Sequence, residues 1–160
     1  MNLLNVLIET ERLTLKPISY DYTEEICMEF IPKLKNKTTQ ETIVNIEKSK
    51  QMIGKSLKEL KNGTILKMVI ISKYSNEFIG LIELNEINTI EPFVEIWIKK
   101  ASRKKVYGLE AMNGLLEWTN ENIKFNYIYY SLRKKTIIKR KEPRINNGKT
   151  IKVYKIIGPS

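Results

Sequence analysis

Apolar residues recur along the chain with two different periods, and these periods predict its secondary structure. Strands are predicted where apolar and polar residues alternate or where β-branched residues are dense, at residues 9–18, 65–72, 77–84, 92–99, 125–132 and 150–157. Helices are predicted where apolar residues follow helical spacing, at residues 22–31, 40–61 and 107–122. The order implies a three-strand meander, followed by a strand–helix–strand crossover with two parallel strands.

The turn inside this crossover is basic. It carries Arg103, Lys104 and Lys105, followed by Gly108, at the point where the helix would begin. A helix N-terminus has unpaired backbone N–H groups and partial positive charge, so added cations favour an anion such as a pyrophosphate. A solvated basic loop between two core elements is the alternative interpretation.

Composition restricts the chemistry that is available. The 160 residues suit one domain, residues 1–160, and no apolar run reaches the roughly 20 residues of a membrane span, so we expect a cytoplasmic protein without membrane contact. There is no histidine, and the one cysteine, Cys27, falls in an apolar-periodic stretch that predicts a buried thiol. His-based triads and thiolate metal clusters are excluded, and we expect no metal. Acid–base work is left to Glu, Asp, Tyr, Lys or water.

Positive charge is concentrated at the C-terminal end. Residues 133–160 contain ten Lys or Arg and one acid, so they hold +9 of the net charge of +10. This segment would meet any polyanionic partner. Because it has no aromatic residue before Tyr154, it predicts salt-sensitive phosphate contacts without base stacking. A solvated basic surface explains the same charges.

Three phrases occur in the order of the predicted elements: RLTLKPIS at 12–19, FIGLIEL at 78–84 and RKKVYGLEA at 103–111. Together they resemble the GNAT acetyltransferase family, in particular its branch of ribosomal-protein-alanine N-acetyltransferases. The third phrase is similar to the family's acetyl-CoA pyrophosphate signature. The resemblance covers residues 10–132 and implies a GNAT-like α+β fold, with a central mixed, mostly antiparallel sheet flanked by helices and one parallel crossover.

The resemblance also implies acetyl-CoA as the co-substrate and a place for it. In the signature, Arg103 matches the Gln/Arg position and Gly108 the Gly/Ala position. Backbone N–H groups of the basic turn would hold the pyrophosphate, and those of the preceding strand, which is splayed in the family, would hold the pantetheine arm and the thioester carbonyl. The turn residues are Lys104, Lys105, Val106, Tyr107 and Gly108, and the strand residues are Trp97, Ile98 and Lys99. The C-terminal cations could alternatively face the 3′-phosphate of CoA.

Three departures from the family pattern stand out. Val106 takes the place of a glycine that would allow close backbone approach or positive φ, and a β-branched residue tolerates neither well. Glu95 stands where the branch has glycine. The family's Asn-x-x-Ser helix should follow Tyr130 and is missing, so residues 133–160 form an atypical, shortened C-terminal part.

Glu83 and Glu95 are the best candidates for a catalytic base. Both are predicted on adjacent central strands, where partial removal from water raises the pKa of a carboxyl group. Glu95 alternates so as to share a face with Phe93 and Trp97, whereas Glu83 could instead face outward. Tyr129 is the candidate proton donor to the leaving thiolate, although half-buried tyrosines of strands are more often structural.

The leading hypothesis is an acetyl-CoA-dependent N-acetyltransferase that acts on a primary amine, of a small molecule or a protein N-terminus, by direct acyl transfer. The alternative is a catalytically weakened GNAT-like domain that binds RNA or the ribosome through residues 133–155. A third hypothesis is a homodimer that completes the exposed edge of the sheet.

Overall fold

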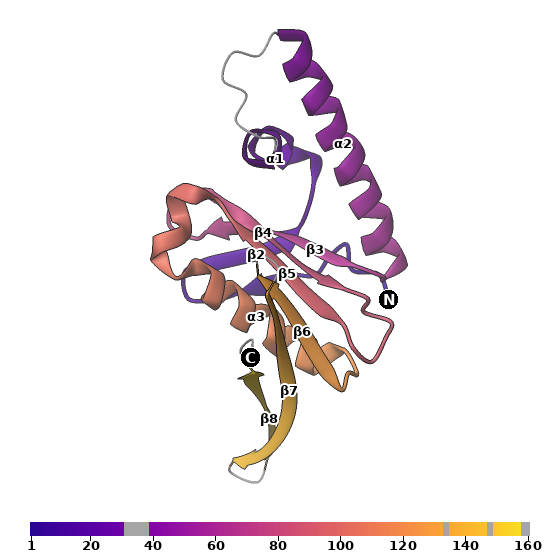
Figure 1. The fold of residues 1–160 in the computed structure, drawn as a ribbon, viewed down its shortest axis with the longest axis vertical. Coiled ribbons are helices and arrows are strands. Elements are labelled where there is room, and N and C mark those ends of the chain that lie inside the picture. The colour runs from indigo at the N-terminus through magenta and orange to yellow at the C-terminus, as the bar shows by residue number, and fades with distance from the viewer. Residues whose placement is uncertain (31–38, 133–134, 147–148, 158–160) are drawn as a thin grey trace.

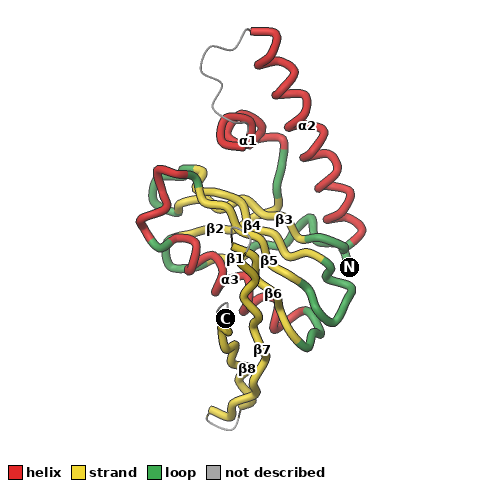
Figure 2. The backbone as a smooth tube through the Cα atoms, in the orientation of Figure 1, coloured by secondary structure: helices red, strands yellow, loops and turns green. Residues whose placement is uncertain are grey.

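The computed structural model describes residues 1–30, 39–132, 135–146 and 149–157. Figures 1 and 2 show the arrangement of its helices and strands. In chain order these are β1 (Ile8–Glu9), β2 (Leu13–Pro17), η1 (Tyr20–Tyr22), α1 (Thr23–Phe30), α2 (Thr39–Asn62), β3 (Leu66–Ser72), β4 (Phe78–Asn85), β5 (Phe93–Ile98), η2 (Lys100–Lys105), α3 (Tyr107–Asn122), β6 (Tyr127–Leu132), β7 (Lys135–Asn146) and β8 (Lys149–Ile157).

The strands of the described residues form one eight-stranded sheet whose spatial order follows the chain. Neighbouring strands are antiparallel, with the exception of β5 and β6, which are parallel because η2 and α3 connect them as a crossover. Helices α1 and α2 lie on one side of the sheet and α3 on the other (Figure 1). The predicted meander, the crossover and the mixed α+β fold are confirmed.

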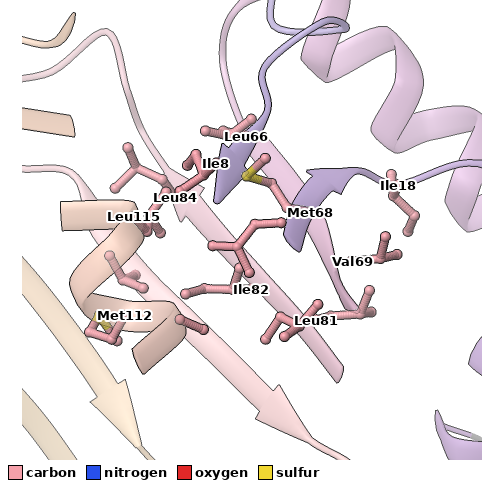
Figure 3. Packing of buried hydrophobic residues seen from close by; sticks show 14 of the residues in the cluster. Ile8, Ile18, Leu66, Met68, Val69, Leu81, Ile82, Leu84, Met112 and Leu115 are labelled. Carbon is pink, nitrogen blue, oxygen red and sulfur yellow. The ribbon is translucent and has the colours of Figure 1, made fainter. Parts of the chain in front are cut away.

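The core joins α3 to the sheet. Met112 and Leu115 on the buried stripe of α3 belong to one hydrophobic cluster with the β4 residues Ile82 and Leu84 (Figure 3). The four side chains are between 0% and 4% exposed. Full burial of one such side chain stabilises the fold by about 1.5–3 kcal/mol, so this layer fixes the position of α3 against the sheet.

Gly80 of the FIGLIEL phrase is required by the approach of β5 to β4. It pairs with Ile98, and a Cβ at Gly80 would lie 2.0 Å from the carbonyl oxygen of Trp97. No side chain fits at that distance. This glycine therefore lets the end of β5 lie close against β4.

The prediction of a single edge strand at 9–18 is wrong. Residues 8–9 and 13–17 form two strands that pair with each other, and β2 lies between β1 and β3. Between them the Thr10 N–H donates to the Leu13 carbonyl (2.9 Å), and the Leu13 N–H donates to the Thr10 hydroxyl (3.0 Å). This turn interrupts an alternation that, in the sequence, looks continuous.

The C-terminal strand is confirmed as β8, but β7 was not predicted. Its many charges and Pro143 hide it from a pattern based on hydrophobicity. Strand β6 pairs only with residues 135–140 of β7, whereas β8 pairs with residues 138–146. At Pro143, β7 therefore has a neighbour on one side only among the described strands, and a proline is tolerated at such an edge.

None of the helices in the described ranges combines the length and the apolar character needed to cross a membrane.

Candidate functional site

The central feature of the site is the point where β5 and β6 part. Their parallel register runs from Phe93–Tyr129 to Glu95–Ser131 and ends there, while β5 continues to Ile98 beside β4. The backbone of the last residues of β5 on the β6 side is therefore outside that ladder. Backbone N–H groups at such an opening are placed to bind an extended ligand.

The backbone donors expected on this strand point in two directions. The Lys99 N–H donates to the Ile79 carbonyl (2.9 Å), so it faces β4. Because backbone groups alternate in direction along an antiparallel strand, Trp97 faces β4 in the same way and Ile98 faces the opening. The Ile98 carbonyl accepts from Arg103 Nε (2.9 Å), and the Lys99 ammonium pairs with Glu77. Of the three expected positions, Ile98 is the one whose N–H is directed at the opening.

The basic turn follows directly. Helix η2 ends in Arg103, Lys104 and Lys105, all exposed, and α3 begins two residues later, at Tyr107. The three cations and the N-terminus of a 16-residue helix thus meet at the open end of β5. Cations at this position add to the partial positive charge of the helix end.

Val106, which joins η2 to α3, has φ of 59° and ψ of 22°. This is the left-handed region, and positive φ is one of the two roles that the sequence assigned to the glycine expected at this position; the chain adopts it with a valine. A non-glycine residue there costs roughly 1–2 kcal/mol, and a β-branched one is especially disfavoured. Its side chain is 60% exposed, so burial of the side chain does not offset this cost.

Gly108, two residues further on, packs the first turn of α3 against β5. A Cβ there would lie 3.5 Å from Ile98 Cγ1 and 3.7 Å from Ile96 Cδ1, which is ordinary contact. Ile96 and Ile98 therefore face α3, and the alternating residues Glu95 and Trp97 face the opposite side of the sheet.

On that opposite side, three charged residues lie in a row across neighbouring strands. Lys67 of β3 is the register partner of Glu83 of β4, which is the partner of Glu95 of β5. The Lys67 ammonium lies 2.8 Å from a Glu83 carboxylate oxygen, and Asn85 Nδ2 donates to the other oxygen (3.1 Å). We call Lys67, Glu83 and Glu95 the charged row. Both carboxylates predicted from the sequence are thus brought together.

The neighbours of the charged row show which layer it faces. Trp97, on the same face of β5, lies 6.5 Å from the ring of Phe78, which lies 6.0 Å from the ring of Tyr22 in η1. Strict alternation from Ile82 would place Phe78 on the α3 side of β4. The register shift between Ile70 and Ile71 of β3 breaks that alternation, and the Phe78 ring lies near Trp97 instead. The row therefore opens on the side of η1, α1 and α2, away from α3.

Within the charged row, the pKa values of the two carboxyl groups move in opposite directions. Burial alone would raise the pKa of Glu83, but the hydrogen bond and charge of Lys67, with further hydrogen bonds from Glu95 and Asn85, hold that pKa below 4.5. The pKa of Glu95 is raised above 4.5, first by its hydrogen bond to Glu83 and then by desolvation and the Glu83 charge. Glu83 is thus the ionised partner and Glu95 the group that holds a proton more readily.

Tyr129 is placed by its backbone alone. It lies in β6 as the register partner of Phe93, and its side chain lies outside what the structure describes. The same holds for the side chains of the basic segment: the backbone of residues 135–146 and 149–157 forms the β7–β8 hairpin, and residues 133–134 are outside the described ranges.

Sequence reasoning missed Lys67 and Asn85. Lys67 is the one charged residue in β3, and Glu83 is the one charged residue in β4. A lone charge in each of two adjacent strands was the available signal, but their meeting depends on register. In the described part of the chain, no group of three or more His, Cys, Asp or Glu residues could hold a metal ion.

A known family matches this chain. The model of the acetyltransferase (GNAT) domain matches residues 12–136, most of the chain. The matched region includes the opening between β5 and β6, the basic turn and the charged row, and it ends just after β7 begins. No curated protein sequence matches the chain.

Solved structures of this fold include several acetyltransferases. A proposed ribosomal-protein-serine acetyltransferase from Vibrio cholerae has a TM-score of 0.68 at 16% identity, over 99% of this chain and 100% of that one. RimL, a ribosomal L7/L12 alpha-N-protein acetyltransferase in complex with coenzyme A, has a TM-score of 0.66 at 13% identity, over 95% and 98%. RimJ from Mycobacterium smegmatis, in complex with a CoA-disulfide, has a TM-score of 0.65 at 13% identity, over 83% and 71%.

Proposed function

Because the chain belongs to the GNAT acetyltransferase family, we propose that it transfers an acetyl group from acetyl-CoA to a primary amine by direct attack, without a covalent enzyme intermediate. The observation that carries the proposal is the coincidence of three features at one end of β5. The β5–β6 ladder stops at Glu95, the basic turn follows Ile98, and α3 presents its N-terminus there.

Acetyl-CoA would lie along this opening. The first-turn N–H groups of α3 and the residues 104–108 suit the pyrophosphate, with Arg103, Lys104 and Lys105 supplying positive charge. The Ile98 N–H, directed at the opening, suits the pantetheine arm or the thioester carbonyl, where a donor stabilises the developing oxyanion. Trp97 and Lys99 would then shape this end of β5 by holding it against β4.

The charged row suits the acid–base step. An alkylammonium must lose a proton before its nitrogen can attack the thioester carbon. Glu95 would take that proton, because Glu83 shares it through their hydrogen bond and Lys67 keeps Glu83 ionised. The attack forms the C–N bond and breaks the C–S bond. The CoA thiolate would be protonated by Tyr129 or by water.

The acceptor is proposed as a primary amine of a protein N-terminus. Support comes from the fold neighbours, since RimL is a protein alpha-N-acetyltransferase. Small-molecule amines are the competing acceptors. Incubation with acetyl-CoA and a mixture of N-terminal peptides and small amines, read by mass spectrometry, would show which gains an acetyl group. Acetylation of only the small amines would overturn the proposal that the acceptor is a protein N-terminus.

The test of cofactor binding is calorimetry with acetyl-CoA at low salt. We expect saturable binding that weakens by about fivefold in K104A/K105A, because two cations at a helix N-terminus contribute several tenths of a kcal/mol each. The control is K55A/K58A, which removes two exposed lysines from α2. Absence of binding by the wild-type chain would overturn the proposed function. Equal loss in both double variants would overturn the role of the turn.

A second candidate function is binding to an acidic partner such as RNA or the ribosome. The observation that favours it is the β7–β8 hairpin, which carries most of the net charge on residues 135–157 and continues past the end of β6. Residues 141–146 of β7 pair only with β8 within the described strands. RNA binding whose salt slope is unchanged after removal of 141–154 would contradict this function.

A homodimer through the outer edge of β8 is a further proposal, because an edge strand offers unpaired backbone groups to a second copy. We expect light scattering to give twice the chain mass for the intact protein and a single chain mass once residues 141–154 are removed. A single chain mass for the intact protein would rule the homodimer out.

A further inference from the structure

The first turn of α3 is fastened to the N-terminal turn of the chain by one carboxylate. Glu110 Oε1 accepts from the Thr10 hydroxyl (2.6 Å) and from the Arg12 N–H (2.7 Å). Glu110 Oε2 accepts from Arg12 Nε at 2.7 Å. We call Thr10, Arg12 and Glu110 the α3 clamp. It joins residues about 100 positions apart in the sequence, between the β1–β2 turn and the helix that follows the basic turn.

The Arg12 side chain is also held by a ring. Its guanidinium carbon lies 4.5 Å from the ring centroid of Tyr107, the first residue of α3. A stacked guanidinium that also donates to a carboxylate has little freedom. Desolvation would raise the pKa of Glu110, but the hydrogen bonds from Thr10 and Arg12 lower it, so the carboxylate stays ionised in the clamp.

The clamp acts on the residues that the proposed function assigns to the pyrophosphate. Glu110 lies one turn after Val106, and its own N–H donates weakly to the Val106 carbonyl (3.4 Å). Val106 has the unfavourable left-handed conformation, which persists only where surrounding contacts determine it. A fixed Glu110 and Tyr107 supply such contacts on the α3 side of the turn.

The clamp also affects the charge at the anion site. Glu110 is the acidic residue of the first turn of α3. An unpaired carboxylate so close to a bound pyrophosphate would repel it, whereas the ion pair with Arg12 cancels its charge. Arg12 therefore lets a helix with an acid in its first turn accept an anion.

We propose that Arg12, Glu110 and Thr10 are positioning residues for acetyl-CoA, which hold the first turn of α3 and neutralise it without belonging to the reacting groups. This inference rests on the proposed function. It predicts that loss of the clamp changes cofactor affinity and leaves the chemical step nearly intact, because the charged row lies on the other face of the sheet.

The experiment measures acetyl-CoA binding by calorimetry and activity by steady-state kinetics for the clamp variants R12Q, T10V and T10S and for one control variant. R12Q leaves the Glu110 charge unpaired, and T10V removes one hydroxyl while keeping the side-chain shape. We expect R12Q to raise the Kd and KM for acetyl-CoA by about tenfold, the loss of a charge-assisted hydrogen bond, with kcat within about twofold of wild type. T10V should raise Kd less, and T10S, which keeps the hydroxyl, should restore it.

The matched control is E9Q, which removes the ion pair of Glu9 with Lys73 (3.6 Å) in the same N-terminal segment without touching α3. Amide hydrogen exchange should accelerate at residues 107–110 in R12Q and stay unchanged in β3, which shows that the variant is folded. Wild-type affinity in R12Q and T10V, or an equal loss in E9Q, would overturn the inference alone. Absence of acetyl-CoA binding by the wild-type chain would overturn the proposed function together with it.

Discussion

Val106 illustrates how a single backbone conformation affects the proposed cofactor site. The turn between η2 and α3 requires φ of 59° at this position, and the chain meets it with a β-branched residue whose side chain is exposed. The conformation is unfavourable for valine and free of strain for glycine. The turn is thus formed at some cost in stability, which the packing of α3 and the α3 clamp must offset.

Replacing this residue by glycine should improve the site. We expect V106G to raise the free energy of unfolding by no more than about 1 kcal/mol, because relief of strain is partly offset by the greater entropy of the unfolded chain. Acetyl-CoA should bind about threefold more tightly, since the backbone can approach the pyrophosphate. V106A, which shortens the side chain but keeps the conformational cost, is the control. A gain in V106A equal to that in V106G would show that bulk and not φ is responsible.

The charged row predicts that two substitutions, E83Q and K67M, shift the pH dependence of kcat/KM in opposite directions. The pKa of Glu95 is raised by the hydrogen bond and charge of Glu83 and lowered by the charge of Lys67. If Glu95 must be ionised to accept a proton, activity falls as pH drops through its pKa. E83Q lowers that pKa, so the acid limb of kcat/KM should move to lower pH. K67M raises it, so the limb should move to higher pH.

The measurement is the pH profile of kcat/KM for wild type, E83Q, K67M and E95Q. E95Q should lose most of the activity, about 10²-fold or more for a general base, and its acid limb should disappear. Shifts in the same direction for E83Q and K67M would refute the assignment of Glu95. Unfolding curves for the three variants separate an effect on the proton from an effect on the fold.

At the scale of elements, β4, β5 and α3 meet through two glycines with different roles. Gly80 lies where a Cβ would collide with the Trp97 carbonyl at 2.0 Å, while a Cβ at Gly108 would make ordinary contacts with Ile98 and Ile96. The first glycine is needed by the β4–β5 approach. At Gly108 no steric contact in the described structure requires a glycine, although the residue belongs to the segment assigned to the cofactor.

Alanine at the two positions should therefore act in opposite directions. G80A should lower the free energy of unfolding by about 1–3 kcal/mol, the usual cost of overpacking, because the strands must separate. G108A should raise it by about 0.5–1 kcal/mol, since alanine is the better helix former. Chemical denaturation of both variants measures these changes. A G80A variant as stable as wild type would show that β5 can shift away from β4 without loss.

At the scale of the molecule, the chain divides into a part that forms the site and a hairpin that extends the sheet. The family match ends at residue 136, the second residue of β7, and the hairpin accounts for the C-terminal strands beyond it. Strand β6 pairs with β7 only through residue 140, whose partner on β8 is Lys155. Among the described strands, the backbone of the outer part of the hairpin therefore pairs only within the hairpin.

Removal of that outer part should leave the cofactor site intact. Because Arg140 and Lys155 are register partners, a two-residue Asn-Gly turn can replace residues 141–154. We expect this variant to unfold cooperatively and to bind acetyl-CoA within about twofold of wild type, since in the described strands β6 pairs with residues 135–140 and not with the removed residues. Thermal unfolding and calorimetry measure both properties. Loss of acetyl-CoA binding by a folded variant would show that the hairpin contributes to the site.

The amino-acid sequence by itself determined most of the elements and their order, the meander with its parallel crossover, and the place of the basic turn. These depend on local properties: period two or period 3.6 along the chain, and residue types next to a helix start. The sequence also marked Val106 as a departure, because a glycine was expected there, but its left-handed backbone is a finding of the structure. Charge and Pro143 concealed β7, and a continuous alternation concealed the turn at Thr10.

The tertiary structure alone decided which residues meet. Lys67, Glu83 and Glu95 form a row only because three strands pair in one register, and a shift of one residue would turn each side chain to the other face. The hydrogen bond between Arg12 and Glu110 joins residues 98 positions apart in the sequence. Such contacts depend on the packing of distant segments, which local propensity does not contain. The sequence thus located the proposed cofactor turn, and the tertiary structure placed Glu83 beside Glu95 and joined Arg12 to Glu110.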